Sequence, residues 1–151
     1  MGQSLSKLIV HIIFHTKRNR IKIRSIDDAR LYAYIGMIIL DNGSYPICIN
    51  GTHNHVHVLL RLSPKLCLSK QVEEIKRHSS RWIKTLDNHY NHFAWQSGYG
   101  AFSVDYLNVD KVIRYIENQK EHHKTVSKRD EYIAWLKRMG MDFDEDYLWR
   151  D

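Results

Sequence analysis

The chain has 151 residues, of which 43% are hydrophobic and 26% charged, a balance that excludes a disordered chain and is typical of one globular domain. Its 23 lysines and arginines outnumber its 17 acidic residues, and the formal charge of +6 favours a polyanionic partner such as nucleic acid, although a basic solvated surface would have the same composition. Two isolated cysteines, no signal-peptide pattern and no apolar stretch long enough for a bilayer argue against an exported or membrane protein, so we expect a cytoplasmic one.

The first third of the chain predicts a strand followed by a helix. Residues 7–15 form a short apolar run rich in β-branched side chains, which is typical of a central strand. Apolar residues then recur at helical spacing over 31–39, after the potential caps Ser25 and Asp27, and Asn42-Gly43 ends this helix.

The middle of the chain predicts a hairpin, a second helix and a fourth strand. Residues 45–50 and 55–62 are β-rich pieces separated by turn-forming residues, as in two antiparallel strands. Apolar positions at helical spacing indicate a helix over 69–86, and a strand follows around 101–104.

Two further helices are expected after the fourth strand, over about 109–123 and 132–139. The order strand, helix, strand, strand, helix, strand, helix predicts an α+β fold, a ferredoxin-like (split βαβ) antiparallel sheet with helices packed on one face. We expect a single domain over residues 1–151, in which 129–151 form a C-terminal helix and tail.

A histidine pair lies in the third predicted strand. Because successive side chains of a strand alternate between faces, His55 and His57 point the same way, and two imidazoles at a rigid strand can bind a divalent metal. His53 could join them unless Asn54 places a turn between. The alternative is a solvated strand face without metal, since ten histidines produce such spacings by chance.

The helix over 109–123 places polar groups at the flank of an apolar face. Tyr115 and Gln119 are four residues apart and lie in one row, which Lys111 and His122 continue. The alternative is a tyrosine that covers apolar surface and leaves its hydroxyl in water.

Together these features resemble the single-tyrosine HUH transposases of the smallest insertion sequences, the insertion sequence two hundred family. The resemblance is carried by His-Val-His-Val-Leu-Leu at 55–60, Trp-Gln-Ser-Gly-Tyr at 95–99 and Arg-Tyr-Ile-Glu-Asn-Gln at 114–119. It extends in order from the first strand to His123, and it departs from the family where Asn54 replaces an aspartate that commonly precedes the first histidine.

The resemblance implies that His55, His57 and Gln119 bind the catalytic divalent metal and that Tyr115 is the nucleophile. It implies an endonuclease and strand transferase that cuts and rejoins single-stranded DNA at hairpins through a 5′-phosphotyrosine, and a homodimer whose sites combine the histidines of one chain with the tyrosine of the other. We expect magnesium or manganese; because magnesium prefers oxygen ligands, two imidazoles and an amide suggest a site that would also accept manganese or a softer ion. Without a phosphate-binding glycine loop we expect no nucleotide cofactor. Lys111, His122 or a metal-bound water are candidates for activating the tyrosine, whose hydroxyl has an ordinary pKa of about 10.

Basic residues could follow DNA phosphates from two places, the segment after the first strand and one face of the second helix. A solvated helix face is the alternative for the second. Other interpretations of the chain are a host-adopted relative that binds hairpins without transposition, a non-catalytic module for single-stranded nucleic acid, and a metal phosphoesterase that uses water. The basic candidates are Arg18, Arg20, Lys76, Arg77, Arg81 and Lys84.

Overall fold

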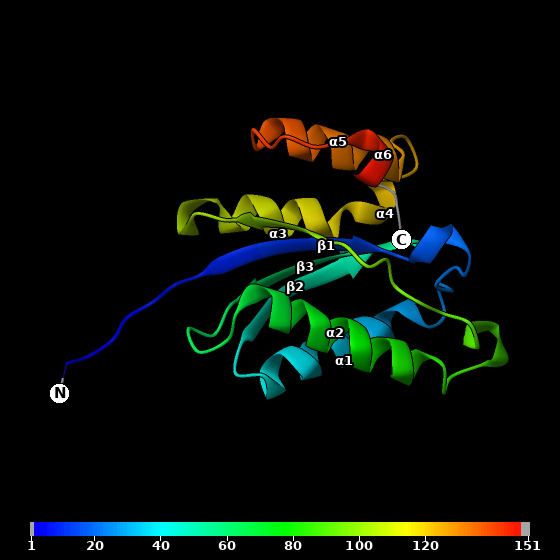
Figure 1. The fold of residues 1–151 in the computed structure, drawn as a ribbon, viewed down its shortest axis with the longest axis horizontal. Helices are drawn as coiled ribbons and strands as arrows, with labels where there is room; N and C mark the ends of the chain where they lie inside the picture. The colour runs from blue at the N-terminus through cyan, green and yellow to red at the C-terminus, as the bar shows by residue number, and fades with distance from the viewer. Residues whose placement is uncertain (1, 149–151) are drawn as a thin grey trace.

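A four-stranded antiparallel sheet lies between two layers of helices in the computed structural model, which describes residues 2–148 (Figure 1). The strand order is β2-β3-β1-β4, so the sequentially first and third strands are central. The strands are β1 (Ile9–His15), β2 (Tyr45–Gly51), β3 (His55–Arg61) and β4 (Gly100–Ser103). The helices are α1 (Asp28–Asp41), α2 (Leu68–Ile83), α3 (Val109–Glu117), α4 (Gln119–His122), α5 (Lys128–Arg138) and α6 (Glu145–Leu148), with 3₁₀ turns η1 (Lys17–Asn19), η2 (Asn88–Tyr90) and η3 (Tyr106–Asn108).

This architecture confirms the predicted α+β fold and antiparallel sheet, but the expectation that the helices pack on one face is wrong. In Figure 1, α1 and α2 lie below the sheet and α3 and α5 above it. The reason lies in the central strands, because nearly every residue of β1 and β3 is buried, whichever face it points to. A sheet whose two faces are both apolar needs cover on both sides.

The lower layer closes a core over the even-numbered face of β1. Ile12 and Phe14 point down from β1, and Val56 and Val58 do so from β3. Each of these side chains is fully buried, and burial of one such side chain contributes about 1.5–3 kcal/mol. They pack against apolar residues of the two lower helices, among them Leu31, Ile35, Ile39, Val72 and Ile75.

The upper layer is attached at two places. Ile116 of α3 packs on Ile9 and Leu59, as the apolar face predicted for this helix requires. Farther along, α5 packs Tyr132 and Leu136 against Ile13 of β1 and Phe102 of β4. The odd-numbered face of β1 and β3 therefore lies beneath helices from the C-terminal half of the chain.

The helix predicted over 109–123 is interrupted at Asn118, where α3 ends and α4 begins. The cause is a tertiary contact from β2, because the Asn50 amide donates hydrogen bonds to the carbonyls of Ile116 at 2.9 Å and Glu117 at 3.2 Å. A side chain that bonds to helix carbonyls in this way bends the helix. Tyr115 therefore lies on α3 and Gln119 at the start of α4, and they remain neighbours, with the Gln119 amide nitrogen 3.4 Å from the Tyr115 carbonyl oxygen.

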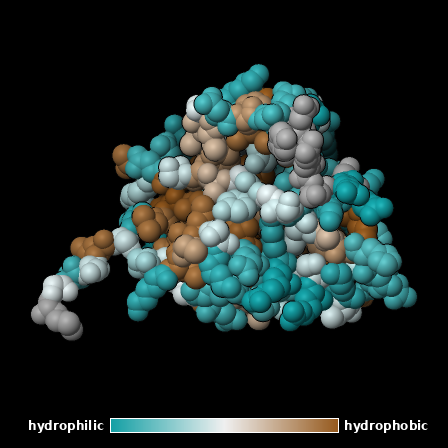
Figure 2. All heavy atoms as spheres, in the orientation of Figure 1, coloured by the Kyte–Doolittle hydropathy of each residue, from teal (hydrophilic) through white to brown (hydrophobic). Residues whose placement is uncertain are grey.

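The outer surface of the lower layer is mostly hydrophilic on the face shown in Figure 2, whereas apolar side chains gather at the level of the sheet. Between residues 2 and 148, no helix is both long and apolar enough to cross a membrane. The last three residues of the tail expected over 129–151 lie outside the described part of the chain.

Candidate active site

The two histidines of β3 point toward the upper helices, as the strand alternation predicts. His55 and His57 are 1% and 0% exposed, and their ring centroids lie 5.2 Å apart. Val56 between them belongs to the core on the opposite face. His53 is exposed and precedes the strand, so it does not join the pair. β3 is central in the sheet, which holds both imidazoles rigidly.

Gln119 and Tyr115 reach the same place from the upper layer. Gln119 is fully buried, and its Oε1 lies 3.3 Å from Nε2 of His55. The Tyr115 ring is half-buried, with its centroid 5.8 Å from that of His57. The structure thus brings together the four residues that the sequence predicts for the centre of the site.

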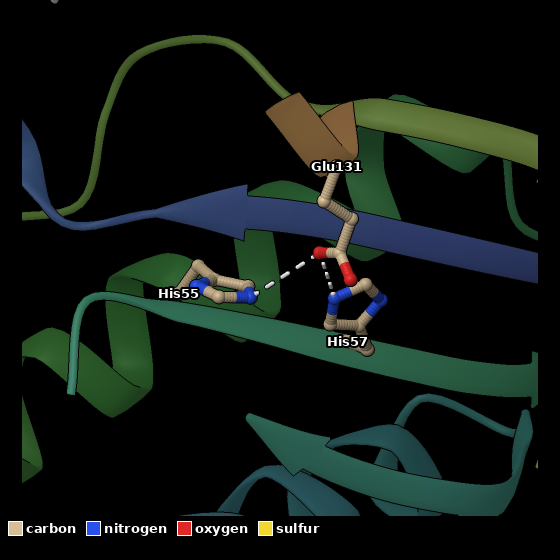
Figure 3. A group of neighbouring side chains, drawn as sticks. All are labelled: His55, His57 and Glu131. Atoms are coloured by element: carbon tan, nitrogen blue, oxygen red, sulfur yellow. Dashed lines mark hydrogen bonds and ion pairs between the residues drawn. The ribbon is translucent and has the colours of Figure 1, made fainter. Parts of the chain in front are cut away.

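A residue that the sequence did not single out occupies the middle of this group. Glu131, in the first turns of α5, is 4% exposed and directs its carboxylate at the histidines (Figure 3). Its Oε1 lies 3.1 Å from Nε2 of His57 and 3.5 Å from Nε2 of His55. Its Oε2 accepts hydrogen bonds from the Tyr115 hydroxyl and, at 3.1 Å, from the Gln119 amide.

Two more imidazoles approach the same carboxylate from the end of α4 and just beyond it. Nε2 of His122 lies 3.2 Å from Oε2 of Glu131, and Nε2 of His123 lies 3.0 Å from Oε1. His122 was a predicted candidate for catalytic support and lies within the site, whereas His123 was not predicted. Lys111, the other candidate, is exposed one turn before Tyr115, and no hydrogen bond or ion pair within residues 2–148 joins it to the cluster.

Contacts behind the two strand histidines fix how their rings are turned. Nδ1 of His55 lies 2.8 Å from Oδ1 of Asn54 and 2.9 Å from Oγ1 of Thr52. Nδ1 of His57 lies 2.8 Å from Nε2 of the buried His11. Both rings therefore use Nδ1 for these contacts and direct Nε2 toward Glu131, the arrangement that proteins use to orient metal-binding histidines. Asn54, which replaces the aspartate that commonly precedes the first histidine in the family, thus still presents a side-chain oxygen to Nδ1 of His55.

Burial favours the neutral form of the two strand histidines, whereas the contacts of Glu131 favour its charged form. Burial lowers the pKa of His55 to about 4, and burial also lowers the pKa of His57 and His11. Burial alone would raise the pKa of Glu131, but hydrogen bonds from His123, His55 and His57 outweigh it and hold that pKa well below its usual value. Burial, followed by the hydrogen bond to Glu131, raises the pKa of Tyr115 well above 10.

This donor set fits a divalent cation. His55, His57 and Glu131 each direct a ligand atom to one point, and these atoms lie within 4.8 Å of one another. Neutral imidazoles have a free ring nitrogen, and the amide oxygen of Gln119 lies beside them. Nδ1 of each ring contacts a neighbouring side chain, so Nε2 is the ring nitrogen that faces the carboxylate. The residues present can therefore hold a metal.

The described chain brings all of these residues together by itself, and the expectation that two subunits share a site stays a prediction. The short η3 turn leads into α3, and α3 packs on the chain's own β2 and β3 through Ile116 and the Asn50 contacts. That packing places Tyr115 beside His57 of the same chain. The sequence could not decide this point, because the loop is compatible with either direction.

The basic face predicted on α2 lies on the opposite side of the sheet from the histidines (Figure 1). Lys76 is half-buried, and its ammonium donates to the carbonyls of Gln96 at 2.8 Å and Gly98 at 2.6 Å, so it holds the segment before β4. Arg77 is exposed and bonds both carboxylate oxygens of Glu74 at 3.0 Å. These contacts favour the alternative of a structural and solvated face.

The remaining basic candidates are exposed. Arg81 and Lys84 lie toward the end of α2, away from the site. Arg18 and Arg20 follow β1 at the end of the sheet where His55 begins β3. Of the six predicted cations, these two arginines lie at the same end of the sheet as the histidines.

An open cleft leads to the tyrosine. It has a volume of about 340 Å³ and lies between α3 and α5. Arg138 and the indole of Trp135 form part of its wall, with the guanidinium 5.5 Å from the ring centroid. Its lining residues are Tyr115, His122, Val126, Asp130, Glu131, Ala134, Trp135 and Arg138.

Comparison with known proteins places this geometry in a family. Residues 4–119 match the family model described as IS200-like transposase. The chain is also similar to a solved structure of a Deinococcus radiodurans protein described as a transposase, with 23% identity, a TM-score of 0.62 and coverage of 79% of this chain and 96% of that one. A second similar structure is a REP-associated tyrosine transposase bound to a REP hairpin, with 14% identity, a TM-score of 0.61 and coverage of 83% and 74%.

At these identities the two structures show a shared fold, and no curated protein matches the chain. The family model spans the whole sheet and ends at Gln119, so it includes both strand histidines and the tyrosine helix. This match covers well over half of the 151 residues and confirms the family resemblance. The chain belongs to the IS200-like transposase family.

Proposed function

We propose that the protein is a metal-dependent transposase that cuts and rejoins single-stranded DNA through a covalent bond to Tyr115. One observation carries this proposal: in one chain, the hydroxyl of Tyr115 lies at a cluster of His55, His57, Gln119 and Glu131. A tyrosine that merely covered apolar surface would leave its hydroxyl in water rather than at such a group.

His55, His57 and Gln119 would hold the divalent metal, with magnesium or manganese as the expected ion. When bound, the metal supplies positive charge that polarises the scissile phosphate. The neutral state of both imidazoles supports this assignment, because a protonated ring has no lone pair to offer.

Tyr115 would act as the nucleophile. Its oxygen forms a bond to phosphorus while the bond from phosphorus to the 3′ oxygen breaks, which leaves a 5′-phosphotyrosine and a 3′-hydroxyl. The raised pKa of Tyr115 means that the hydroxyl keeps its proton at neutral pH, so it needs an acceptor. Oε2 of Glu131 already accepts the hydrogen bond of that hydroxyl, and Nε2 of His122 lies 3.2 Å from the same carboxylate oxygen.

The reverse reaction would rejoin strands without a nucleotide cofactor. The phosphotyrosine retains the energy of the broken phosphodiester, and the 3′-hydroxyl of another strand can attack it. The proton returns from the attacking hydroxyl to the Tyr115 oxygen by the same route. Cutting and joining therefore need the same few side chains.

The expected substrate is single-stranded DNA beside a hairpin. The similar REP-associated tyrosine transposase was solved with a REP hairpin, which supports this class of substrate. Arg18 and Arg20 at the histidine end of the sheet, and Arg138 in the cleft that leads to Tyr115, are suitable for phosphate contacts. A homodimer stays a prediction.

Cleavage of single-stranded DNA from the genomic flanks of the gene tests the proposal. With manganese, the wild type should form a protein–DNA adduct that survives denaturation, and Tyr115→Phe should form none while it still binds DNA. His57→Ala should lose the adduct too, whereas Gln119→Ala should lose less, because water can replace an amide oxygen. Tyr106→Phe is the control, since Tyr106 is exposed outside the site. Hairpin binding without any adduct would favour a binding-only relative instead.

A further inference from the structure

The carboxylate at the centre of the site comes from a part of the chain that the family model does not match. That model ends at Gln119, whereas Glu131 belongs to α5. α5 is nonetheless integrated into the fold, because Ser127 caps its start and Tyr132 packs beside Ile13 and Phe102. The helix therefore presents Glu131 from a fixed support.

We propose that Glu131 is a ligand of the catalytic metal and that it also positions the Tyr115 hydroxyl, so that α5 is a working part of the active site. This proposal rests on the metal-dependent function proposed above and names a further residue for it.

The distances among the donor atoms agree with one shared cation. Ligand atoms about 2.1 Å from a metal in tetrahedral or octahedral geometry lie roughly 3.0–3.4 Å from one another. Oε1 of Glu131 lies 3.1 Å from Nε2 of His57 and 3.5 Å from Nε2 of His55, and Oε1 of Gln119 lies 3.3 Å from the latter atom. The carboxylate oxygen is as well placed as the amide oxygen.

The charge of the site gives an independent reason to expect Glu131 as a metal ligand. His55, His57 and Gln119 would all bind a metal as neutral ligands, so together they leave the charge of a buried dication uncompensated. Magnesium and manganese prefer oxygen ligands, above all carboxylates. Among the described residues, the carboxylate grouped with His55 and His57 is that of Glu131.

The other oxygen of the carboxylate connects the metal site to the nucleophile. Oε2 accepts the hydrogen bond of the Tyr115 hydroxyl and is 3.1 Å from the Gln119 amide nitrogen. A group that binds the metal through Oε1 and the hydroxyl through Oε2 holds the nucleophile at a constant distance from the metal. Glu131 is a positioning residue in this respect.

A competing interpretation is that Glu131 occupies the place of the metal and keeps it out. The same contacts, from His55, His57 and His123, would then stabilise a metal-free, closed site. The two interpretations predict opposite effects of removing the charge: a ligand that is neutralised weakens metal binding, whereas an occupant that is neutralised strengthens it.

The test measures Mn²⁺ binding by the full chain, by calorimetry and by the electron paramagnetic resonance signal of free Mn²⁺. Glu131→Gln keeps the shape of the side chain and should weaken Mn²⁺ binding at least about tenfold, as loss of metal-site partners typically does. Asp142→Asn is the matched control, because it removes the same charge at an exposed position outside the lining of the cleft and should leave the affinity unchanged. Circular dichroism checks that each variant is folded.

Three results separate this inference from the function on which it rests. If His57→Ala abolishes Mn²⁺ binding and Glu131→Gln weakens it, the metal-dependent function and the role of Glu131 are both supported. If His57→Ala abolishes binding while Glu131→Gln leaves it unchanged or tighter, Glu131 is no ligand and only this inference falls. If the wild type binds no Mn²⁺, or His57→Ala binds it equally well, the metal-dependent function itself fails. Glu131→Asp, which retains the charge, should keep more affinity than Glu131→Gln.

Discussion

The turn that leads from β2 into β3 should tolerate no side chain at Gly51. A Cβ built there would lie 2.2 Å from the carbonyl oxygen of His55 and 3.0 Å from Cα of Val56. The first distance is more than about 1 Å shorter than an ordinary contact, and the neighbouring atoms are backbone, which cannot rotate away. Gly51→Ala must therefore push the start of β3 away from β2.

The magnitude follows from what this shift breaks. The His55 carbonyl accepts a hydrogen bond from the Thr52 amide at 3.0 Å, and the same turn holds Nδ1 of His55 through Thr52 and Asn54. Overpacking typically costs about 1–3 kcal/mol, and we expect the upper end here, about 3 kcal/mol. At about 2–4 °C per kcal/mol for a chain of this size, Tm should fall by roughly 6–12 °C.

Urea unfolding and thermal melts measure this change, and Mn²⁺ affinity reports the displaced imidazole. Gly36→Ala is the matched control: Gly36 lies inside α1, where a Cβ would meet only ordinary contacts at 3.9 Å. That substitution should stabilise by about 0.5–1 kcal/mol, the difference between alanine and glycine in a helix. A Gly51→Ala protein with wild-type Tm and Mn²⁺ affinity would refute this account of the turn.

Two further predictions concern pH and the assignment of the site to one chain. Burial raises the pKa of Asp27, but hydrogen bonds from Tyr90 and Arg24 outweigh burial and lower that pKa. The charged carboxylate therefore stabilises the fold fully above its unfolded pKa of about 3.9, and this stabilisation is lost as the pH falls through the lower pKa of the folded state. Asp27→Asn should therefore be about 1.5–3 kcal/mol less stable than wild type at pH 7 in urea unfolding, and this gap should begin to narrow as the pH falls below about 4. A gap of constant size from pH 7 to the lowest pH at which the protein is folded would contradict this. An equimolar mixture of His57→Ala and Tyr115→Phe should stay inactive in DNA cleavage, because each chain lacks one part of its own site, and recovered cleavage would show that chains share sites.

Two pairs of residues at the site could be predicted because each pair depends on local geometry alone. The alternation of a strand puts His55 and His57 on one face, and helical spacing puts Tyr115 and Gln119 in one row. Neither relation needs knowledge of the rest of the fold.

The two-sided sheet was within reach of the sequence but was missed. The run from Ile9 to Phe14 is apolar at nearly every position, and such a run is typical of a strand that is buried on both faces. His11 interrupts the run and faces the site, where it contacts His57. A histidine in an otherwise apolar central strand was the available signal that this face carries polar chemistry.

Other features depend on contacts that no local pattern contains. The break at Asn118 is due to Asn50, which is 68 positions earlier in the sequence. Lys76 looked like a DNA-binding cation but bonds to carbonyls before β4. Glu131 is adjacent in sequence to the exposed Asp130, and no local pattern distinguishes the two carboxylates. The packing of α5 directs the carboxylate of Glu131 into the site.

Peptide mapping of the covalent adduct tests the central claim most directly. The wild-type protein is incubated with manganese and single-stranded DNA from its genomic flanks, and the denatured product is digested with nuclease and protease before mass spectrometry. The account predicts one nucleotide-bearing peptide with its modification on Tyr115, in the segment Arg-Tyr-Ile-Glu-Asn-Gln. A modification on Tyr99 or Tyr106, or cleaved DNA with no modified tyrosine at all, would contradict it.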